Sequence, residues 1–374
     1  MKQLFVTCPH GFEPILEQEL KTLGLHSLTQ GFCGVSVPKS FDNICLINYQ
    51  SRVATRVLWP IADFSCKDKD DLYANAKNIP WSDFMHCNKT FAIDSNVSHP
   101  NLTNSLFASL VVKDAICDFF REQTGARPSI DKQFPDVQIN LFIQKGRATI
   151  YIDTSGAPLH KRGWRDLHTE ATMHESLAAA LLLFTKYSKD KTFCDPFCGS
   201  GTFLMEAAMI ATHTPPGFLR KKWGFFHLPG FDKAHWLEWK EAQDSLRIPL
   251  EKGKIFGSDK SRETSEACQN HLRKLGFASS IEVQYNDIAY YTPPTPPHCV
   301  LTNPPYGKRL ETSILLFQQF AEFLQNKCAP DVTAYLLYPE QELLETAGLS
   351  VYPELSFKNG GLPIKLFSVK KNLT

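Results

Sequence analysis

The feature that most constrains the fold is a glycine-rich turn between a short apolar run and a helix-like run. Residues 192–195 have the composition of a buried strand, and residues 202–212 have that of a helix. Between them lies the turn Asp195-Pro196-Phe197-Cys198-Gly199-Ser200-Gly201-Thr202. Glycines let the backbone approach a ligand closely, and open α/β sheets bind cofactors at the carboxyl ends of their strands. The pattern predicts a small-molecule site at this strand end.

This turn matches neither of the common phosphate-binding signatures. A dinucleotide fold requires Gly-x-Gly-x-x-Gly, and a phosphate loop requires a Lys after its last Gly. Neither arrangement is present at residues 195–202. A tight turn without a ligand is the alternative interpretation of the motif.

The remainder of the C-terminal half alternates strand-like and helix-like runs. Strands are expected at residues 254–259, 281–285, 299–301 and 333–338, and helices at residues 174–187, 262–275 and 314–326. Such alternation predicts a doubly wound, mostly parallel sheet. Residues 350–370 read as two strands joined across Asn359-Gly360-Gly361, a turn sequence suited to positive φ, so the sheet should end in an antiparallel hairpin.

The first 155 or so residues instead predict small α+β units. Strands are expected at residues 3–8, 90–97, 137–143 and 148–152, and helices at residues 12–23 and 105–120. A connection at residues 213–249 interrupts the later alternation. Its aromatic residues argue against disorder, and long connections in compact domains are often functional. They are Phe218, Trp223, Phe225, Phe226 and Trp236.

Composition narrows the class of protein. A chain of 374 residues with 43% hydrophobic residues is long enough for two or more packed domains. Its longest apolar run is far shorter than the roughly 20 residues of a membrane span, and its start does not resemble a signal peptide. Eleven cysteines, without a Cys-x-x-Cys pair, favour reduced thiols in a cytoplasmic protein and no structural zinc. The oligomeric state stays open.

Acidic residues recur where the predicted strands end. Asp259 closes the run at residues 254–259, and its two oxygens could accept both hydroxyls of a ribose. Capping the helix that follows is the rival role for Asp259. Asp287, after residues 281–286, could accept a hydrogen bond from an adenine amino group.

The most specific motif is Asn303-Pro304-Pro305-Tyr306, directly after an apolar strand. Two prolines fix the backbone and remove NH donors, so carbonyl oxygens can face a substrate amine. The side-chain oxygen of Asn303 and the carbonyl of Pro304 can each accept one amine hydrogen. Tyr306 offers a flat surface on which a flipped base can stack. A plain Pro-Pro turn is the alternative.

The net charge of +1 gives no global signal for nucleic-acid binding, so an RNA surface would have to be local. Three basic clusters are candidates, although each could equally be a solvated loop. They are Lys161, Arg162 and Arg165; Arg220, Lys221 and Lys222; and Lys308 with Arg309.

Two further stretches give the chain a family resemblance. They are Asp153-Thr154-Ser155-Gly156-Ala157-Pro158-Leu159-His160-Lys161-Arg162-Gly163-Trp164-Arg165 and Glu175-Ser176-Leu177-Ala178-Ala179-Ala180-Leu181. With the motifs at residues 195–202 and 303–306, they are similar to the THUMP-domain class I RNA guanine-N2 methyltransferases. That family includes the methylase of bacterial 23S rRNA and its tRNA relatives, and the resemblance covers nearly the whole chain.

The resemblance implies an α/β protein with three parts. These are a ferredoxin-like subdomain at residues 1–58, a THUMP RNA-binding domain at residues 59–155, and a Rossmann-like class I methyltransferase domain at residues 156–374. It implies S-adenosylmethionine as the cofactor and RNA as the partner, with rRNA favoured over tRNA, and neither a membrane nor a metal. The implied cofactor contacts are Asp195, Pro196, Phe197, Cys198, Gly199, Gly201, Asp259, Lys260, Asp287, Ile288 and Asn303. The implied catalytic residues are Asn303, Pro304, Pro305 and Tyr306.

Direct in-line transfer of a methyl group to guanine N2 is the expected reaction. Asn303 and Pro304 would hold the amine, and no strong general base would be needed because the methylated amine becomes acidic. Three alternatives remain: the same reaction on tRNA, methylation of adenine N6 in DNA, and an RNA-binding assembly factor with an inactive methyltransferase fold.

Overall fold

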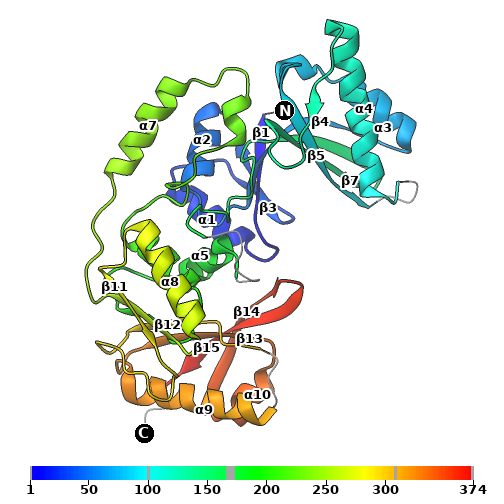
Figure 1. Ribbon diagram of the computed structural model, residues 1–374. Coiled ribbons are helices and arrows are strands. Elements are labelled where there is room, and N and C mark those ends of the chain that lie inside the picture. Colours follow the sequence, from blue (N-terminus) through cyan, green and yellow to red (C-terminus); the bar gives the residue numbers. More distant parts are fainter. Residues whose placement is uncertain (1, 99–101, 166–172, 307–309, 372–374) are drawn as a thin grey trace. The chain divides into compact units, whose positions relative to one another are not determined.

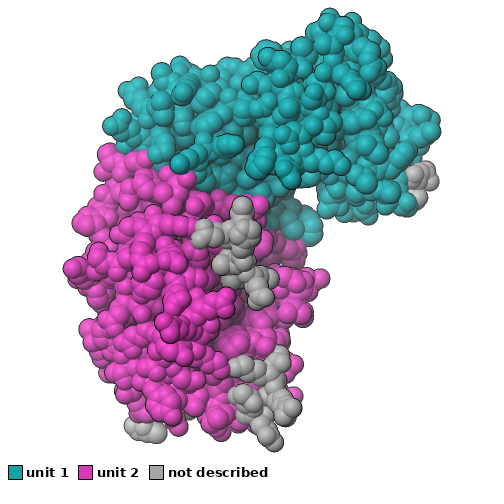
Figure 2. Space-filling model, in the orientation of Figure 1, with its two compact units in different colours: residues 1–8, 16–159, 220–241 teal, residues 9–15, 160–219, 242–374 magenta. Residues whose placement is uncertain are grey.

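The computed structural model describes residues 2–98, 102–165, 173–306 and 310–371, and for residues 310–312 it describes the backbone only. The chain divides into two compact units, coloured separately in Figure 2. Unit 1 comprises residues 1–8, 16–159 and 220–241. Unit 2 comprises residues 9–15, 160–219 and 242–374.

Unit 1 is built on an eight-stranded sheet with the order β2-β3-β1-β4-β8-β7-β5-β6 (Figure 1). The strands are β1 (Gln3–Thr7), β2 (Thr29–Gly31), β3 (Gly34–Pro38), β4 (Arg56–Ser65), β5 (Thr90–Ser98), β6 (Ser129–Ile130), β7 (Val137–Gln144) and β8 (Arg147–Asp153). The helices of the first 155 residues are α1 (Glu13–Thr22), α2 (Phe41–Gln50), α3 (Lys69–Lys77), the short η1 (Trp81–Asp83) and α4 (Ser105–Thr124).

Several local predictions for this half are confirmed. The strands expected at residues 137–143 and 148–152 are β7 and β8, which form a hairpin whose turn residues Lys145 and Gly146 have φ values of 50° and 72°. Helix α4 ends at Gly125, which adopts the left-handed conformation with φ 74°. Glycine closes helices well there because it lacks the Cβ that disfavours this conformation. Strand β4 pairs with both β1 and β8, so the expected boundary at residue 58 falls inside a strand.

Residues 220–241 belong to unit 1, although they were expected in the C-terminal domain. The reason is aromatic packing around Tyr49 of α2. The ring of Trp236 lies 5.6 Å from that of Tyr49 and 5.0 Å from that of Phe225, and Trp223 is buried. The segment contains η2 (Gly224–His227) and the start of α7 (Lys233–Ser245). Its aromatic residues therefore form a core, as their number suggested.

Unit 2 contains a seven-stranded sheet with the order β11-β10-β9-β12-β13-β15-β14. The strands are β9 (Phe193–Asp195), β10 (Ile255–Asp259), β11 (Ile281–Tyr285), β12 (Cys299–Thr302), β13 (Thr333–Tyr338), β14 (Ser350–Asn359) and β15 (Leu362–Lys370). The helices are α5 (Glu175–Phe184), α6 (Thr202–Ala211), α8 (Arg262–Leu275), α9 (Leu310–Lys327) and α10 (Gln341–Thr346). Strands β9 to β13 pair in parallel, and β14 and β15 form the antiparallel hairpin. The predicted fold class is confirmed.

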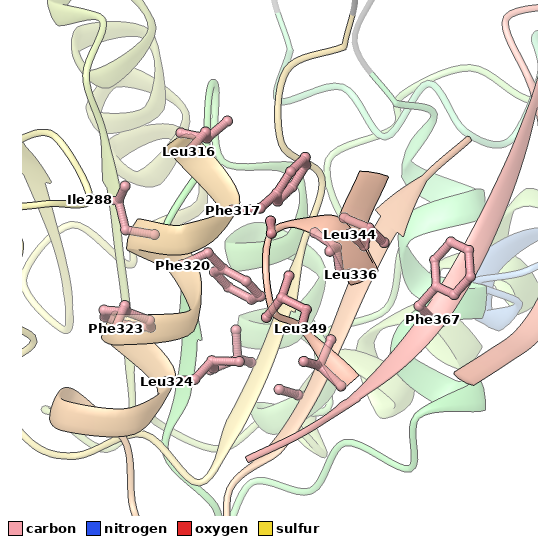
Figure 3. Close-up of a cluster of buried hydrophobic side chains, with 14 of the residues drawn as sticks. Ile288, Leu316, Phe317, Phe320, Phe323, Leu324, Leu336, Leu344, Leu349 and Phe367 are labelled. Carbon is pink, nitrogen blue, oxygen red and sulfur yellow. The ribbon is translucent and has the colours of Figure 1, made fainter. Parts of the chain in front are cut away.

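A buried hydrophobic cluster holds α9 to this sheet (Figure 3). Phe317, Phe320 and Leu324 follow one another at helical spacing and are each 2% exposed or less. Leu336 of β13 and Leu344 of α10 join them. Burying side chains of this size contributes roughly 1.5–3 kcal/mol each. The cluster thereby anchors the chain that continues from β12.

Across residues 2–98, 102–165, 173–306 and 310–371, no helix is both long and apolar enough to cross a membrane. Within those same ranges, no group of three or more His, Cys, Asp or Glu side chains is arranged to hold a metal ion. All eleven cysteines are free thiols in the structure.

Candidate active site

The predicted site lies where the strand order of unit 2 reverses. Strand β9 has β10 on one side and β12 on the other, and both neighbours run parallel to it. Ligands of open α/β sheets bind at the carboxyl ends of such central strands. Cys194 of β9 is paired with Val300 of β12, so Asp195 and Asn303 follow strands that end at the same sheet edge.

Asp195 is tied directly to the end of β12. The Thr302 hydroxyl donates to Oδ1 of Asp195 over 2.6 Å, and the Phe197 backbone NH donates to the same oxygen over 3.1 Å. Among the described residues, none donates a hydrogen bond to Oδ2 of Asp195. Burial raises the pKa of the Asp195 carboxyl to about 7, the two donors oppose this shift, and the Asp259 charge adds to it. The carboxyl therefore titrates near neutral pH.

The glycines of the turn serve two different purposes. Gly201, with φ 86°, begins α6, and a Cβ there would overlap the sulfur of Cys268. Gly199, with φ 52°, is different, since a Cβ there would meet no atom within 4 Å. Gly201 is required by packing, whereas Gly199 leaves open space beside the loop. That space fits a small molecule lying against the backbone.

Asp259 connects the loop to the next strand and helix. Its Oδ2 accepts from the NH of Gly199 over 2.8 Å. Its Oδ1 accepts from the NH of Ser261 over 2.8 Å and from the hydroxyl of Thr264 over 3.0 Å. A carboxylate has about four acceptor sites, so one remains on Oδ2. Asp259 thus supports the start of α8 and has room for one ribose hydroxyl. The sequence had predicted that it accepts both hydroxyls of the ribose. Lys260 is exposed.

Asp287 and Ile288, the predicted adenine contacts, differ in their exposure. Oδ1 of Asp287 accepts from the backbone NH of Ala289 over 3.1 Å, and its carboxylate lies at the surface. Ile288 is 5% exposed and belongs to the hydrophobic cluster beneath α9 (Figure 3). The Ile288 side chain thus packs in the core, and its contact with adenine stays a prediction.

The turn after β12 presents Asn303 and Tyr306 together. The Tyr306 hydroxyl donates a hydrogen bond to Oδ1 of Asn303. The Tyr306 ring packs edge-on against Tyr338 with ring centroids 5.8 Å apart, and Tyr338 lies 4.8 Å from Phe317. Burial raises the pKa of Tyr306, so its hydroxyl remains a donor at neutral pH. Pro304 is buried and Pro305 exposed.

Two predicted RNA-binding arginines have structural roles instead. The guanidinium of Arg162 pairs with Glu206 over 3.2 Å, and both side chains are at most 1% exposed. Arg220 stacks on Trp223 with the guanidinium 4.4 Å from the ring centroid, and it donates to three backbone carbonyls of residues 155–158. A phosphate cannot replace these partners without exposing buried groups, so the prediction for both arginines is corrected.

The other basic candidates differ from one another. Lys161, Lys221 and Lys222 are exposed. Arg165 is half-buried and donates to Glu175 over 3.0 Å and to the Thr202 hydroxyl, at the start of α6, over 2.8 Å. Arg165 therefore braces the loop that precedes α6. Lys308 and Arg309 lie outside the described residues.

Sequence reasoning missed Thr302 as a member of the site. The available signal was a polar residue ending an otherwise apolar strand, immediately before Asn303. It also missed the bracing role of Arg165, because Thr202 is 37 residues away and no local pattern joins them.

Three family models match the chain. The model described as RMKL-like, methyltransferase domain, matches residues 162–363. A THUMP domain model matches residues 66–153, and an RlmL ferredoxin-like domain model matches residues 3–58.

Solved structures share this fold over their whole length. SMU.472, crystallised with SAH, is 24% identical with a TM-score of 0.88, covering 100% of this chain and 99% of that one. A protein from Clostridium difficile described as a possible methylase is 28% identical with a TM-score of 0.86, covering 100% and 99%. A predicted N6-adenine-specific DNA methylase from Listeria monocytogenes is 26% identical with a TM-score of 0.84, covering 98% and 95%.

The methyltransferase model spans more than half of the chain and includes the residue 195–202 turn, Asp259 and the Asn303 turn. With the THUMP and RlmL ferredoxin-like matches before it, this arrangement supports an RNA methyltransferase. The chain belongs to the RMKL-like methyltransferase family.

Proposed function

We propose that the chain transfers a methyl group from S-adenosylmethionine to the exocyclic N2 of guanine in structured RNA, with 23S rRNA as the favoured substrate. The observation that carries this proposal is the hydrogen bond between Thr302 and Asp195, 2.6 Å long, which joins the cofactor loop to the turn that begins at Asn303. One small molecule and one base can share such a site.

The cofactor would be held by the residues at the ends of β9, β10 and β11. Oδ2 of Asp195 and the backbone from Pro196 through Cys198 and Gly199 to Gly201 would take the methionine part. The remaining acceptor site of Asp259 would take one ribose hydroxyl, and Asp287 the adenine amino group. When bound, S-adenosylmethionine supplies an electrophilic methyl group on its sulfonium. SMU.472, which shares the fold, was crystallised with SAH, in keeping with this assignment.

The substrate amine would be held by the turn after β12. Oδ1 of Asn303 accepts one hydrogen bond from Tyr306 and retains a second acceptor site. Among the described residues, no backbone NH donates to the carbonyl oxygen of Pro304. These two oxygens can accept both hydrogens of an NH₂ group and favour a tetrahedral nitrogen. Orienting the reactants can lower a barrier by roughly 7–11 kcal/mol, and fixed carbonyl dipoles stabilise the positive charge that develops on nitrogen.

The target base would leave its stack and lie on the Tyr306 ring, which Tyr338 and Phe317 support. Extrusion costs a few kcal/mol in a duplex and less in a loop, so a loop or junction is the expected location. Lys161, Lys221 and Lys222, together with Lys308 and Arg309, would contact phosphates. The THUMP match favours RNA, and rRNA is favoured because the family that the sequence resembles includes the methylase of bacterial 23S rRNA.

We propose the domain boundaries of the sequence analysis with one amendment. The ferredoxin-like subdomain ends near residue 58 and the THUMP domain near residue 155. The methyltransferase domain covers residues 156–374 except for residues 220–241, which pack with unit 1.

Methylation of adenine N6 in DNA is the second candidate. An Asn-Pro-Pro-Tyr turn can hold any exocyclic amine, and the Listeria monocytogenes relative is described as an N6-adenine-specific DNA methylase. TrmN from Thermus thermophilus, at 18% identity and a TM-score of 0.72, shares the fold.

Nucleoside mass analysis separates the candidates. Ribosomal RNA, tRNA and DNA from cells lacking this protein are incubated with the protein and S-adenosylmethionine. The proposal expects N2-methylguanosine in 23S rRNA. N6-methyladenine in DNA would replace the proposal with its rival, and N2-methylguanosine in tRNA alone would correct the substrate. No methylated product and no calorimetric binding of S-adenosylmethionine would favour an inactive fold.

A further inference from the structure

Phe134 of unit 1 is unusually exposed for an aromatic residue. Its side chain is 72% exposed and lies in the loop at residues 131–136, between β6 and β7. An exposed phenylalanine gains little from folding, because its apolar surface stays in water. An exposed aromatic ring is better evidence of a binding site when the surrounding backbone holds it in place.

Both ends of the Phe134 loop are fixed by hydrogen bonds. Oδ1 of Asp131 accepts from the backbone NH groups of Gln133 and Phe134, each over 2.9 Å. At the other end, Oδ2 of Asp136 accepts from the NH of Thr90 over 3.0 Å, and the Thr90 hydroxyl accepts from the NH of Asp136 over 3.0 Å. The ring therefore projects from an ordered turn.

Cationic side chains lie next to this ring. The Lys222 ammonium is 5.5 Å from the Phe134 ring centroid. Nδ1 of His227 lies 3.3 Å from Oδ1 of Asp136. Burial lowers the pKa of His227, the Asp136 charge opposes this shift, and the charges of Lys89 and Lys222 add to it. The acidic groups of the loop are already engaged, because Asp131 and Asp136 accept from backbone NH groups.

We propose that Phe134 is a stacking platform for an unpaired RNA base, with Lys222 binding an adjoining phosphate. An aromatic ring beside lysines suits single-stranded nucleic acid, since every base has a flat face and every linkage a negative charge. A protein partner would leave the positive charges unmatched unless it were acidic. This inference rests on the proposed function in taking RNA as the substrate.

Trp223, the aromatic residue next to Lys222 in the sequence, does not offer such a platform. Trp223 is 3% exposed and packs inside the aromatic core of unit 1, so its ring is not accessible to a base. Phe134 is distant from Lys222 in sequence, and only the fold brings the two together.

The test measures RNA affinity in matched variants of the full chain. The probes are a fluorescein-labelled single-stranded RNA of mixed sequence and a fully paired duplex of the same length. Phe134→Ala should weaken single-strand binding by about tenfold, in the range found when one stacking aromatic is removed, and affect the duplex less. Phe134→Trp should restore the affinity. Lys222→Ala should weaken both probes and reduce the salt dependence by the equivalent of about one phosphate contact.

Phe32→Ala is the matched control. Phe32 is 76% exposed and lies between β2 and β3, at the opposite sheet edge from β6. Its removal should leave RNA affinity unchanged. Unchanged single-strand affinity in Phe134→Ala would overturn the inference, and so would an equal loss in Phe32→Ala.

Two further readouts separate this inference from the proposed function. Phe134→Ala should raise KM for RNA while kcat at saturating RNA and S-adenosylmethionine binding stay close to native. A product other than N2-methylguanosine would refute the proposed function and leave the stacking site standing. A fall in kcat with native RNA affinity would refute the stacking site.

Discussion

The Tyr306 hydroxyl donates a hydrogen bond to Oδ1 of Asn303, the oxygen that we propose as an acceptor for the substrate amine. Tyr306 therefore orients the Asn303 side chain before substrate arrives, and one acceptor site of Oδ1 stays available. Preorganisation of this kind reduces the cost of ordering groups during the reaction.

Asn303→Ala should lower kcat steeply, by about 10²–10³ if its oxygen acts as a preorganised dipole of ordinary strength. Binding of S-adenosylmethionine should stay near native, because Asp195, Asp259 and the glycine loop remain. Single-turnover kinetics and calorimetry measure the two effects. Asn326→Ala, on the exposed face of α9, is the control and should change neither. Native turnover in Asn303→Ala would refute its assigned role.

Tyr306→Phe and Tyr306→Ala should differ strongly. The phenylalanine variant keeps the ring against Tyr338 and loses only the hydrogen bond to Asn303. The alanine variant also loses the stacking surface, which is worth about 1–3 kcal/mol per base. Steady-state kinetics should show a larger rise in KM for RNA in the alanine variant. Equal effects in both variants would argue against stacking.

The raised pKa of Asp195 gives a stability prediction with a definite sign. The carboxyl titrates at about 7 in the folded protein, against about 3.9 in an unfolded chain. Between these values the folded state binds more protons, so this group's stabilising contribution is present at low pH and is lost as pH rises to about 7. Asp195→Asn cannot ionise and can still accept from Thr302. Its melting temperature relative to native should therefore rise between pH 5 and pH 8, as thermal unfolding would show. A difference that stays constant or falls would contradict the shift.

Arg162→Ala should destabilise the protein instead of weakening RNA binding directly. The change leaves Glu206, whose side chain is fully buried, without its partner. Breaking a buried pair in this way costs about 3–5 kcal/mol. Chemical denaturation measures the loss, and Lys161→Ala at the exposed neighbouring position is the control, with stability near native. A stable Arg162→Ala protein with weakened RNA affinity would reinstate the original prediction.

Local pattern was sufficient for many elements of the fold. Residues 262–275, 281–285 and 333–338 were predicted with the bounds that α8, β11 and β13 have. Residues 281–285 alternate apolar and polar side chains, residues 333–338 form a short, mostly apolar run, and α8 is stopped by Gly276 in the left-handed conformation. Strand β4 was missed. Proline interrupts a strand pattern, and here the register of the β4–β8 pair shifts between Pro60 and Ala62, which accommodates it.

The candidate site was predictable to the extent that its residues follow strands in order. Asp195, Asp259 and Asn303 could be assigned to one edge because parallel strands end together. The partners of basic residues could not be assigned in this way. Arg162 and Glu206 are 44 residues apart, and an arginine in a basic cluster looks the same in sequence whether it binds phosphate or a buried carboxylate.

The most direct test of the central claim is a crystal structure of the protein with S-adenosylhomocysteine. The account predicts that the amino-acid end of the ligand contacts Asp195 and the loop at Gly199, with its sulfur facing Asn303 and the Pro304 carbonyl. A ligand bound elsewhere, or one whose sulfur faces away from Asn303, would contradict the account.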